Sequence, residues 1–141
     1  KEMSVDTMTL SHTLKASIAQ RLVALSCPKC QRPLNKNERS VCLNHGAPVK
    51  LVDSMIENDG CEACGFDGVN GRTAIQEFSF FERESELNFV RNPDPDKLNA
   101  LMVAKGLPSL AEKAWSLAAR KIIPVCEALN VAGHKPEEDA A

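Results

Sequence analysis

Four of the six cysteines stand in two Cys-x-x-Cys pairs, Cys27/Cys30 and Cys61/Cys64. Two intervening residues let both sulfurs of a pair face one ion, and two pairs supply the four thiolates that Zn²⁺ prefers at structural sites. Residues 31–60 separate the pairs, and a loop of this length closes at modest entropic cost. Because a four-thiolate site keeps no open position for water, we predict a zinc ion that stabilises the fold and does not catalyse.

The remaining cysteines allow other interpretations. The unit Cys42-Leu-Asn-His45 could replace one pair as ligands, but the doubled pairing favours an inserted loop that carries a free thiol and a surface histidine. The pair Cys27/Cys30 alone could be a redox dithiol, which would need a βαβ context that is missing here. Three disulfides would suit a secreted protein, and nothing in the sequence suggests export. Cys126 stands among apolar residues and is predicted to be a buried free thiol.

The composition is that of a globular protein and argues against nucleic acid as a partner. The chain has 141 residues, 43% hydrophobic and 26% charged, with a net charge of −2. Residues 27–64 contain as many acidic as basic side chains and no aromatic ring, so the predicted metal lobe offers neither a basic face nor a stacking surface. No apolar run approaches the ~20 residues of a membrane span. The first residue is Lys1 rather than Met, so we expect a piece of a longer protein.

Motifs for catalysis are missing from these residues. No phosphate-binding Gly-x-x-x-x-Gly-Lys-Ser/Thr loop occurs, and the glycines at every third position from Gly65 to Gly71 suit turns rather than a dinucleotide site. The histidines His12, His45 and His134 are scattered, and no serine or cysteine nucleophile has a recognisable partner. The residues by themselves therefore predict a metal-stapled, non-catalytic unit.

The elements around the cysteines follow from hydrophobic periodicity. Apolar residues recur every fourth position from Leu10 to Leu22, which predicts a helix over 9–25. Turn residues dominate 26–72, where we expect little regular structure beyond short strands or a helical turn at 49–52 and 54–56. Residues 73–81 predict a strand with Ala74, Phe78 and Phe80 on one face.

Helices are predicted over most of the remaining chain. One covers 82–91, and another runs from the N-cap Asp94 to Lys105 and ends at Gly106. Its buried positions, and those of the helix that follows, are Leu98, Leu101, Met102, Leu110, Ala114, Leu117 and Ala118. Ser109 and Glu112 form a capping box for that next helix, and a last helix runs from Pro124 to Leu129. Residues 133–141 are expected to form a flexible tail.

Two segments of the sequence resemble motifs of one known family. Gly60-Cys-Glu-Ala-Cys-Gly-Phe-Asp-Gly-Val-Asn-Gly-Arg-Thr-Ala-Ile-Gln-Glu-Phe78 is similar to the C-terminal signature of the type II secretion and type IV pilus assembly ATPases. Upstream, Ile18-Ala-Gln-Arg-Leu-Val23 before the first cysteine pair resembles a second motif of that family. Three positions differ from its pattern: Phe66 where Tyr is common, Ala74 where Gly is usual, and the Cys42/His45 unit.

The resemblance implies an α+β, mainly helical fold at the end of a RecA-like domain. It would comprise a RecA-domain helix (1–25), an inserted zinc subdomain (26–72), a strand plus C-terminal helical bundle (73–132) and the tail. The zinc ligands would be Cys27, Cys30, Cys61 and Cys64. The parent would be a hexameric, cytoplasmic motor, peripheral at the inner membrane, whose ATP and Mg²⁺ site lies before Lys1.

The function implied is that of a zinc-binding C-terminal segment of such an ATPase. The segment would contribute to subunit contacts and to coupling with an inner-membrane platform protein, without catalysis of its own. Gln20 and Arg21 could reach the nucleotide of a neighbouring subunit, although a surface pair packed within the domain is the simpler interpretation. A free-standing zinc adaptor that binds other proteins is the alternative function.

Overall fold

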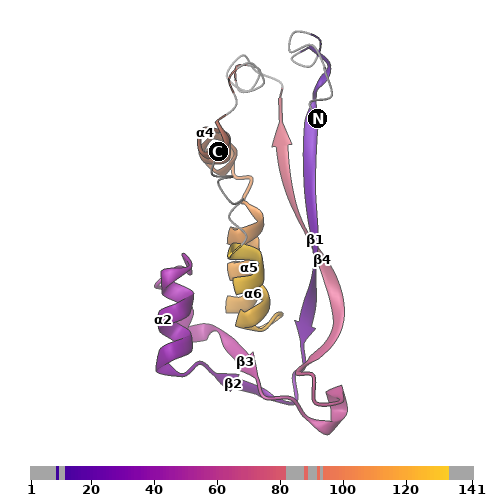
Figure 1. Ribbon diagram of the computed structural model, residues 1–141, viewed down its shortest axis with the longest axis vertical. Coiled ribbons are helices and arrows are strands. Elements are labelled where there is room, and N and C mark those ends of the chain that lie inside the picture. The colour runs from indigo at the N-terminus through magenta and orange to yellow at the C-terminus, as the bar shows by residue number, and fades with distance from the viewer. Residues whose placement is uncertain (1–8, 10–11, 82–87, 89–91, 93, 134–141) are drawn as a thin grey trace, which may run out of the picture. The chain divides into compact units, whose positions relative to one another are not determined.

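The computed structural model describes residues 9, 12–81, 88, 92 and 94–133, and both helices and strands contribute to it (Figure 1). The elements, in chain order, are β1 (Ala16–Ser26), β2 (Gln31–Pro33), α2 (Lys36–Asn44), the 3₁₀ turn η1 (Val52–Ser54), β3 (Ile56–Asn58), the 3₁₀ turn η2 (Glu62–Cys64), β4 (Val69–Phe80), α4 (Pro95–Ala104), α5 (Leu110–Ala119) and α6 (Val125–Ala132). The fold class is therefore α+β, as expected. No described helix is long and apolar enough to cross a membrane.

The chain divides into two compact units. The first comprises residues 1–20 and 76–109, and the second comprises residues 21–75 and 110–141. The helix predicted over 82–91 and the tail predicted over 133–141 fall almost entirely outside the described residues. The second unit contains all six cysteines and the core described below.

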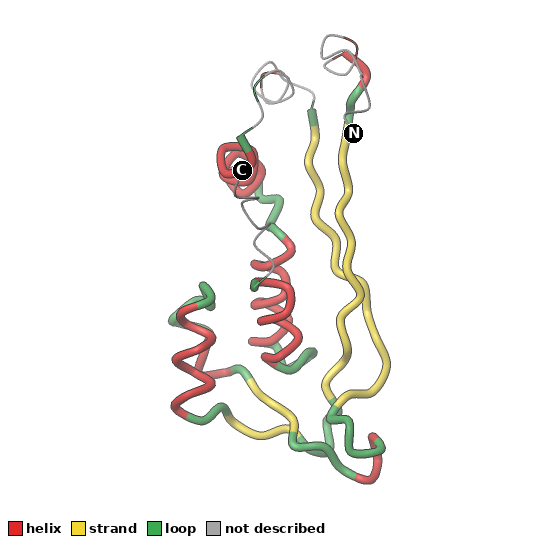
Figure 2. The backbone as a smooth tube through the Cα atoms, in the orientation of Figure 1, coloured by secondary structure: helices red, strands yellow, loops and turns green. Residues whose placement is uncertain are grey.

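The long strands β1 and β4 pair in a two-stranded sheet that has residues in both units (Figure 2). Phe81 N donates to Lys15 O at 2.9 Å, and Gln76 Nε2 donates to Gln20 Oε1 at 2.8 Å. From Lys15 to Gln20 the residue numbers rise by five, whereas their partners fall from Phe81 to Gln76. The two strands are therefore antiparallel. Gln20 and Arg21 lie on strand β1, and the side chain of Gln20 accepts this hydrogen bond from Gln76 on the neighbouring strand.

The helix predicted over 9–25 is wrong from Ala16 onward. Helical backbone is found at Thr9, His12 and Thr13, and β1 then begins at Ala16. A spacing of four residues places side chains on one face of a strand as well as of a helix, so the spacing alone did not distinguish them. Ile18 and Leu22 are more than 60% exposed, and Val23 on the other face of the strand is buried.

The predicted strand at 73–81 is confirmed and begins earlier, at Val69. The rings of Phe78 and Phe80 stack with their centroids 6.3 Å apart, consistent with the expected common face. The residue of β4 that enters the core is Ile75, on the opposite face, at 4% exposure. The core of the second unit therefore draws one side chain from each long strand, Val23 from β1 and Ile75 from β4.

Helix α4 of the first unit follows its predicted boundaries. The side chain of Asp94 accepts a hydrogen bond from Lys97 N, and Pro95 occupies the first turn, where a missing N–H costs nothing. Gly106 follows the helix with φ +77°, a left-handed conformation that glycine adopts without strain. Met102 is buried, as predicted, and Leu98 and Leu101 are half-buried.

Helices α5 and α6 contribute six of the thirteen buried residues in the core of the second unit. Ala114 and Ala118 of α5 are fully buried as predicted, and Leu110 and Leu117 are partly buried against them. Trp115, the only tryptophan, also lies in this core at 2% exposure and is not among the predicted buried positions. Helix α6 starts one residue after the expected Pro124 and extends past Leu129 to Ala132. The other buried members of this core are Val23, Cys42, Ala47, Val52, Met55, Ile75, Ile123, Val125, Ala128 and Val131.

The segment between the cysteine pairs is more regular than predicted. It contains helix α2 and an antiparallel pair of short strands, in which Arg32 of β2 lies opposite Glu57 of β3. The turn of helix expected near 49–56 is present as η1, which packs on α2 and α5, and β3 packs on α6. The insertion is therefore part of the second unit's core and not a loose loop.

Candidate metal centre

The four paired cysteines converge on one point. Their sulfur atoms all lie within 4.8 Å of one another, and Cys27 is buried while the other three are half-buried. Each sulfur of the first pair approaches one of the second, because Cys27 Sγ lies 3.9 Å from Cys61 Sγ and Cys30 Sγ lies 4.0 Å from Cys64 Sγ. No disulfide joins any of these cysteines. The fold thus brings together two sequence motifs that stand more than thirty residues apart.

This spacing fits a tetrahedral ion. A Zn–S bond of about 2.3 Å places the sulfurs of a regular tetrahedron about 3.8 Å apart. The sulfur separations of 3.7, 3.9 and 4.0 Å lie close to that value. Four cysteine thiols are also the donor set that soft, tetrahedral metals prefer. The cluster can therefore hold a metal ion, and its dimensions are consistent with zinc.

Backbone N–H groups point at the sulfurs and fix their positions. Cys61 N and Gly68 N donate to Cys64 Sγ at 3.2 and 3.3 Å. Cys27 N donates to Gly68 O at 3.0 Å, which joins the two cysteine loops directly. Gly60 is required because a Cβ there would lie 2.3 Å from the carbonyl oxygen of Phe66. The second loop therefore closes only when glycine stands at this position.

A polar side chain that the sequence analysis did not select holds the first loop. Asn58 Nδ2 donates to Cys27 O at 2.8 Å and to Cys30 Sγ at 3.3 Å, and Asn58 Oδ1 accepts from Ser26 Oγ at 2.7 Å. Gln31 Nε2 in turn donates to Ser26 Oγ at 3.0 Å. The one sequence feature that could have indicated this role is the position of Asn58, three residues before the second cysteine pair. An asparagine at such a position is equally typical of a turn.

The surroundings shift the pKa values of two cluster cysteines in opposite directions. Although a backbone hydrogen bond from Lys29 opposes the shift, desolvation and three neighbouring sulfurs raise the pKa of Cys27 to about 11. Desolvation acts in the same direction at Cys64, but backbone hydrogen bonds from Cys61 and Gly68 outweigh it and lower the pKa of Cys64 to about 7. Four thiolates cannot accumulate in so small a space unless a cation compensates their charge, so metal binding would release protons.

The other two candidate ligands lie elsewhere. Cys42 is 0% exposed in the core, where desolvation raises its pKa. His45 is exposed at the end of α2, and its Nδ1 lies 2.9 Å from Val41 O. Among the described residues, neither belongs to a cluster that could hold a metal ion. The free thiol and surface histidine expected here are present, although Cys42 is a core residue rather than a loop residue.

The prediction for Cys126 is wrong, because the residue is exposed. It stands second in α6, with its N–H donating to Glu57 Oε2 at 3.1 Å. Its backbone thus connects α6 to β3. Desolvation of the sulfur, together with the nearby Glu57 carboxylate, raises the pKa of Cys126 to about 12.

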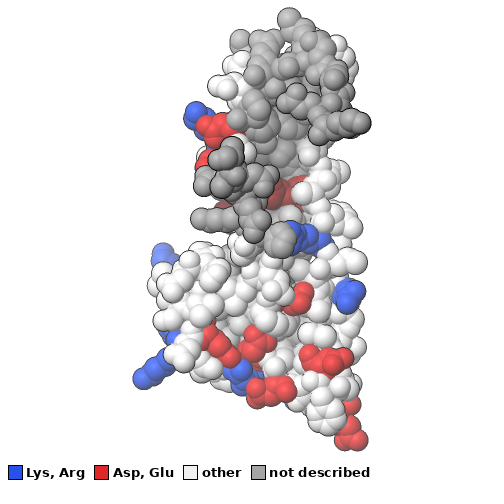
Figure 3. Space-filling model, viewed as in Figure 1, with Lys and Arg blue, Asp and Glu red and all other residues white. Residues whose placement is uncertain are grey.

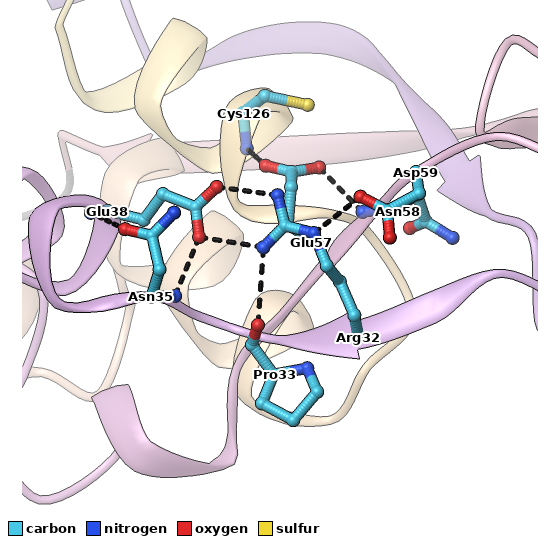
Figure 4. A network of polar contacts seen from close by, with 8 residues as sticks. All are labelled: Arg32, Pro33, Asn35, Glu38, Glu57, Asn58, Asp59 and Cys126. Atoms are coloured by element: carbon cyan, nitrogen blue, oxygen red, sulfur yellow. Dashed lines mark hydrogen bonds and ion pairs between the residues drawn. The ribbon is translucent and has the colours of Figure 1, made fainter.

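A cluster of charged residues secures the insertion next to the metal centre (Figure 4). Arg32 binds both carboxylate oxygens of Glu38, at 2.7 and 2.8 Å, and its Nε donates to Asp59 at 2.6 Å. Glu38 also forms a reciprocal capping box with Asn35 at the start of α2. Because Asp59 N donates to Cys30 O at 3.2 Å, this cluster links the start of α2 to the first cysteine loop.

Comparison with known proteins agrees with the resemblance in the motifs. A family model described as Type II/IV secretion system protein matches residues 1–130. The type II secretion system protein E of Aeromonas hydrophila is 38% identical over 79 residues, 55% of this chain and 15% of the relative. The putative type II secretion system protein E of Escherichia coli K12 is 30% identical over 104 residues, 72% of this chain and 20% of the relative.

The similarity also extends to pilus proteins. The type IV pilus assembly ATPase PilB of Thermus thermophilus is 28% identical over 129 residues, which is 91% of this chain and 14% of the relative. The chain spans a fifth or less of the length of these relatives. Since the family model covers nearly all of the sequence, with both cysteine pairs and both motif segments inside the match, this chain belongs to the type II/IV secretion system protein family.

Proposed function

We propose that this chain is the zinc-binding C-terminal segment of a secretion or pilus assembly ATPase. One structural Zn²⁺ is bound by Cys27, Cys30, Cys61 and Cys64. The observation that supports this most directly is the convergence of four sulfurs at tetrahedral spacing, in a chain that belongs to the secretion family. The ion holds together the two cysteine loops of the second unit.

In this proposal the segment is a structural part of a larger cytoplasmic motor. ATP and Mg²⁺ are bound by other parts of the parent, because these residues contain no phosphate-binding loop. The segment contributes to contacts between the subunits of a hexamer and to coupling with a platform protein of the inner membrane. The relatives named as ATPases support the motor, and a four-sulfur site, which leaves no open position for water, suits a structural part rather than a catalytic one.

Metal analysis of the purified chain tests the zinc site. We expect one zinc per chain, retained by Cys126→Ser and lost in the double variant Cys30→Ser/Cys64→Ser. Cys126 is a suitable control because it is exposed and lies outside the cluster. A chain that binds no zinc when refolded with the metal, or paired cysteines found as disulfides, would contradict the proposal.

The reading frame upstream of Lys1 distinguishes the motor from the free-standing adaptor. We expect a phosphate-binding loop encoded in that frame and no ATP turnover by the 141 residues alone. A start codon directly before Lys1 would support the adaptor, and ATP hydrolysis by this chain alone would contradict the structural role.

A further inference from the structure

Phe66 projects from the second cysteine loop into solvent. Its side chain is 74% exposed, and its φ of +68° lies in the left-handed region, which is unfavourable for a bulky residue. Phe66 N donates to Cys61 O at 2.9 Å, so the backbone below the ring is held next to the metal centre. Neither packing within the chain nor backbone preference explains a phenylalanine here, which indicates that the ring has a binding role.

The surroundings of this ring are acidic. Glu62 and Asp67 are exposed on the same loop, and residues 60–68 include no lysine or arginine. Figure 3 shows acidic atoms and white atoms where the η2 loop lies. We name Phe66 with Glu62 and Asp67 the acidic knob. A surface that accepts it must combine an apolar pocket with basic side chains.

The second unit itself carries a pocket of this kind. A cavity of about 350 Å³ is lined by Arg21, Arg72, Leu22, Val23 and Val131, and we name it the arginine pocket. Leu22 is 63% exposed there. Neither arginine forms an ion pair within the part of the chain that the structure describes. Two cations and the exposed side chain of Leu22 are therefore available to a ligand.

One acidic group also lines the pocket, and it is already engaged. The Glu127 carboxylate accepts a hydrogen bond from Ala24 N at 2.8 Å, which fixes it against strand β1. The two arginines still outnumber it, so the pocket favours an anionic ligand. The size is also suitable, since a cavity of about 150 Å³ is enough for benzene.

We propose that the acidic knob of one chain docks into the arginine pocket of a second copy. The Phe66 ring enters beside Leu22, and the carboxylates of the knob face Arg21 and Arg72. Aromatic anchors in pockets are typical of the residues that dominate binding energy, and complementary charge selects the orientation. This inference rests on the proposed function, because it assigns residues to a contact between subunits.

Each contact joins a knob to a pocket, which are different surfaces of the chain, so a single contact of this kind runs head to tail. Each copy can therefore bind one neighbour through its knob and another through its pocket. Two variants that each lack one half should not associate alone but should form a 1:1 complex when mixed. A contact that pairs like with like, knob to knob or pocket to pocket, would not show this complementation.

Sedimentation of the zinc-loaded chain tests the proposal. We expect the wild type to associate as its concentration rises, more weakly at high salt, and Phe66→Asn or Arg72→Glu alone to weaken this at least tenfold. A mixture of Phe66→Asn, which keeps the pocket, with Arg72→Glu, which keeps the knob, should form a dimer. The proposal is overturned if the wild type stays monomeric up to about 1 mM, the weak end of specific binding, or if the mixture does not associate.

Two matched controls separate docking from general effects. Lys121→Asn replaces the other described non-glycine residue with positive φ, at +61°, and Arg120→Glu reverses an exposed arginine outside the pocket. Both should associate like the wild type, and equal weakening by either would overturn the assignment of knob and pocket. All variants should retain one zinc per chain, so loss of docking and failure of the zinc site are measured independently.

Discussion

The strained backbone at Phe66 predicts an unusual response to substitution. Phe66→Asn should raise the free energy of unfolding of the zinc-loaded chain by about 0.5–1 kcal/mol, because asparagine tolerates the left-handed region and little ring burial is lost. Urea unfolding followed by the fluorescence of Trp115 measures this change. A decrease would mean that the ring contributes to packing within the chain and that its exposure has another cause.

Substitution of Cys42 distinguishes a cysteine that packs in the core from one that binds the metal. Cys42→Ser places a hydroxyl in the closed core and should lower the free energy of unfolding by about 1–3 kcal/mol, while zinc stays at one per chain. Cys61→Ser should instead remove the metal, since its sulfur belongs to the cluster. Metal analysis and thermal unfolding of both variants check this. Zinc loss from Cys42→Ser would return that residue to the ligand set.

At the scale of elements, the start of α2 should make stability depend on pH. The hydrogen bond from Arg32 lowers the pKa of Glu38 from 4.5 to about 2. The stabilisation is therefore fully present above about pH 4.5 and is lost as the pH falls toward 2. Since both side chains are about a quarter to a third exposed, solvent screening limits the effect to about 1 kcal/mol at neutral pH.

Comparison of the wild type with Glu38→Gln measures this contribution. The difference in unfolding free energy should stay constant from pH 7 to about pH 4.5 and shrink as the pH falls from there toward 2, because protonation of Glu38 in the unfolded chain removes its advantage. Any acid release of zinc affects both proteins and largely cancels in the difference. A difference that stays constant or grows below about pH 4.5 would show that Glu38 acts through packing and not through its charge.

The elements also show what the sequence could predict. The cysteine pairs and helix α4 carry local signals, spacing in one case and capping residues in the other, and both are present in the structure. Helix α2 was missed because Lys36–Asn44 lacks apolar periodicity and depends on its capping box instead. Strand β1 depends on pairing with β4, more than forty residues away. Asn58 and Arg32 likewise gain their roles from distant partners, which local pattern analysis cannot supply.

At the scale of the whole molecule, the metal centre is joined to the apolar core of the second unit. Ser26 N, directly before Cys27, donates to Ile122 O at 2.8 Å, and Gln31 Nε2 donates to Lys121 O at 3.2 Å. Both acceptors lie between α5 and α6. The first cysteine loop is therefore hydrogen-bonded to the connection between the two core helices. We expect loss of the metal to destabilise the core.

The single tryptophan reports this coupling. Trp115 lies in the core, so its fluorescence shifts to the red when the unit unfolds. The metal-free unit has a small apolar interior. Chelation of zinc should therefore lower the urea concentration at the midpoint of this shift, by an amount equivalent to several kcal/mol of unfolding free energy. Added zinc in excess should restore the original midpoint, which serves as the control for damage by the chelator. Identical unfolding curves with and without metal would mean that the core folds independently of the four cysteines, and the structural role of the ion would then be abandoned.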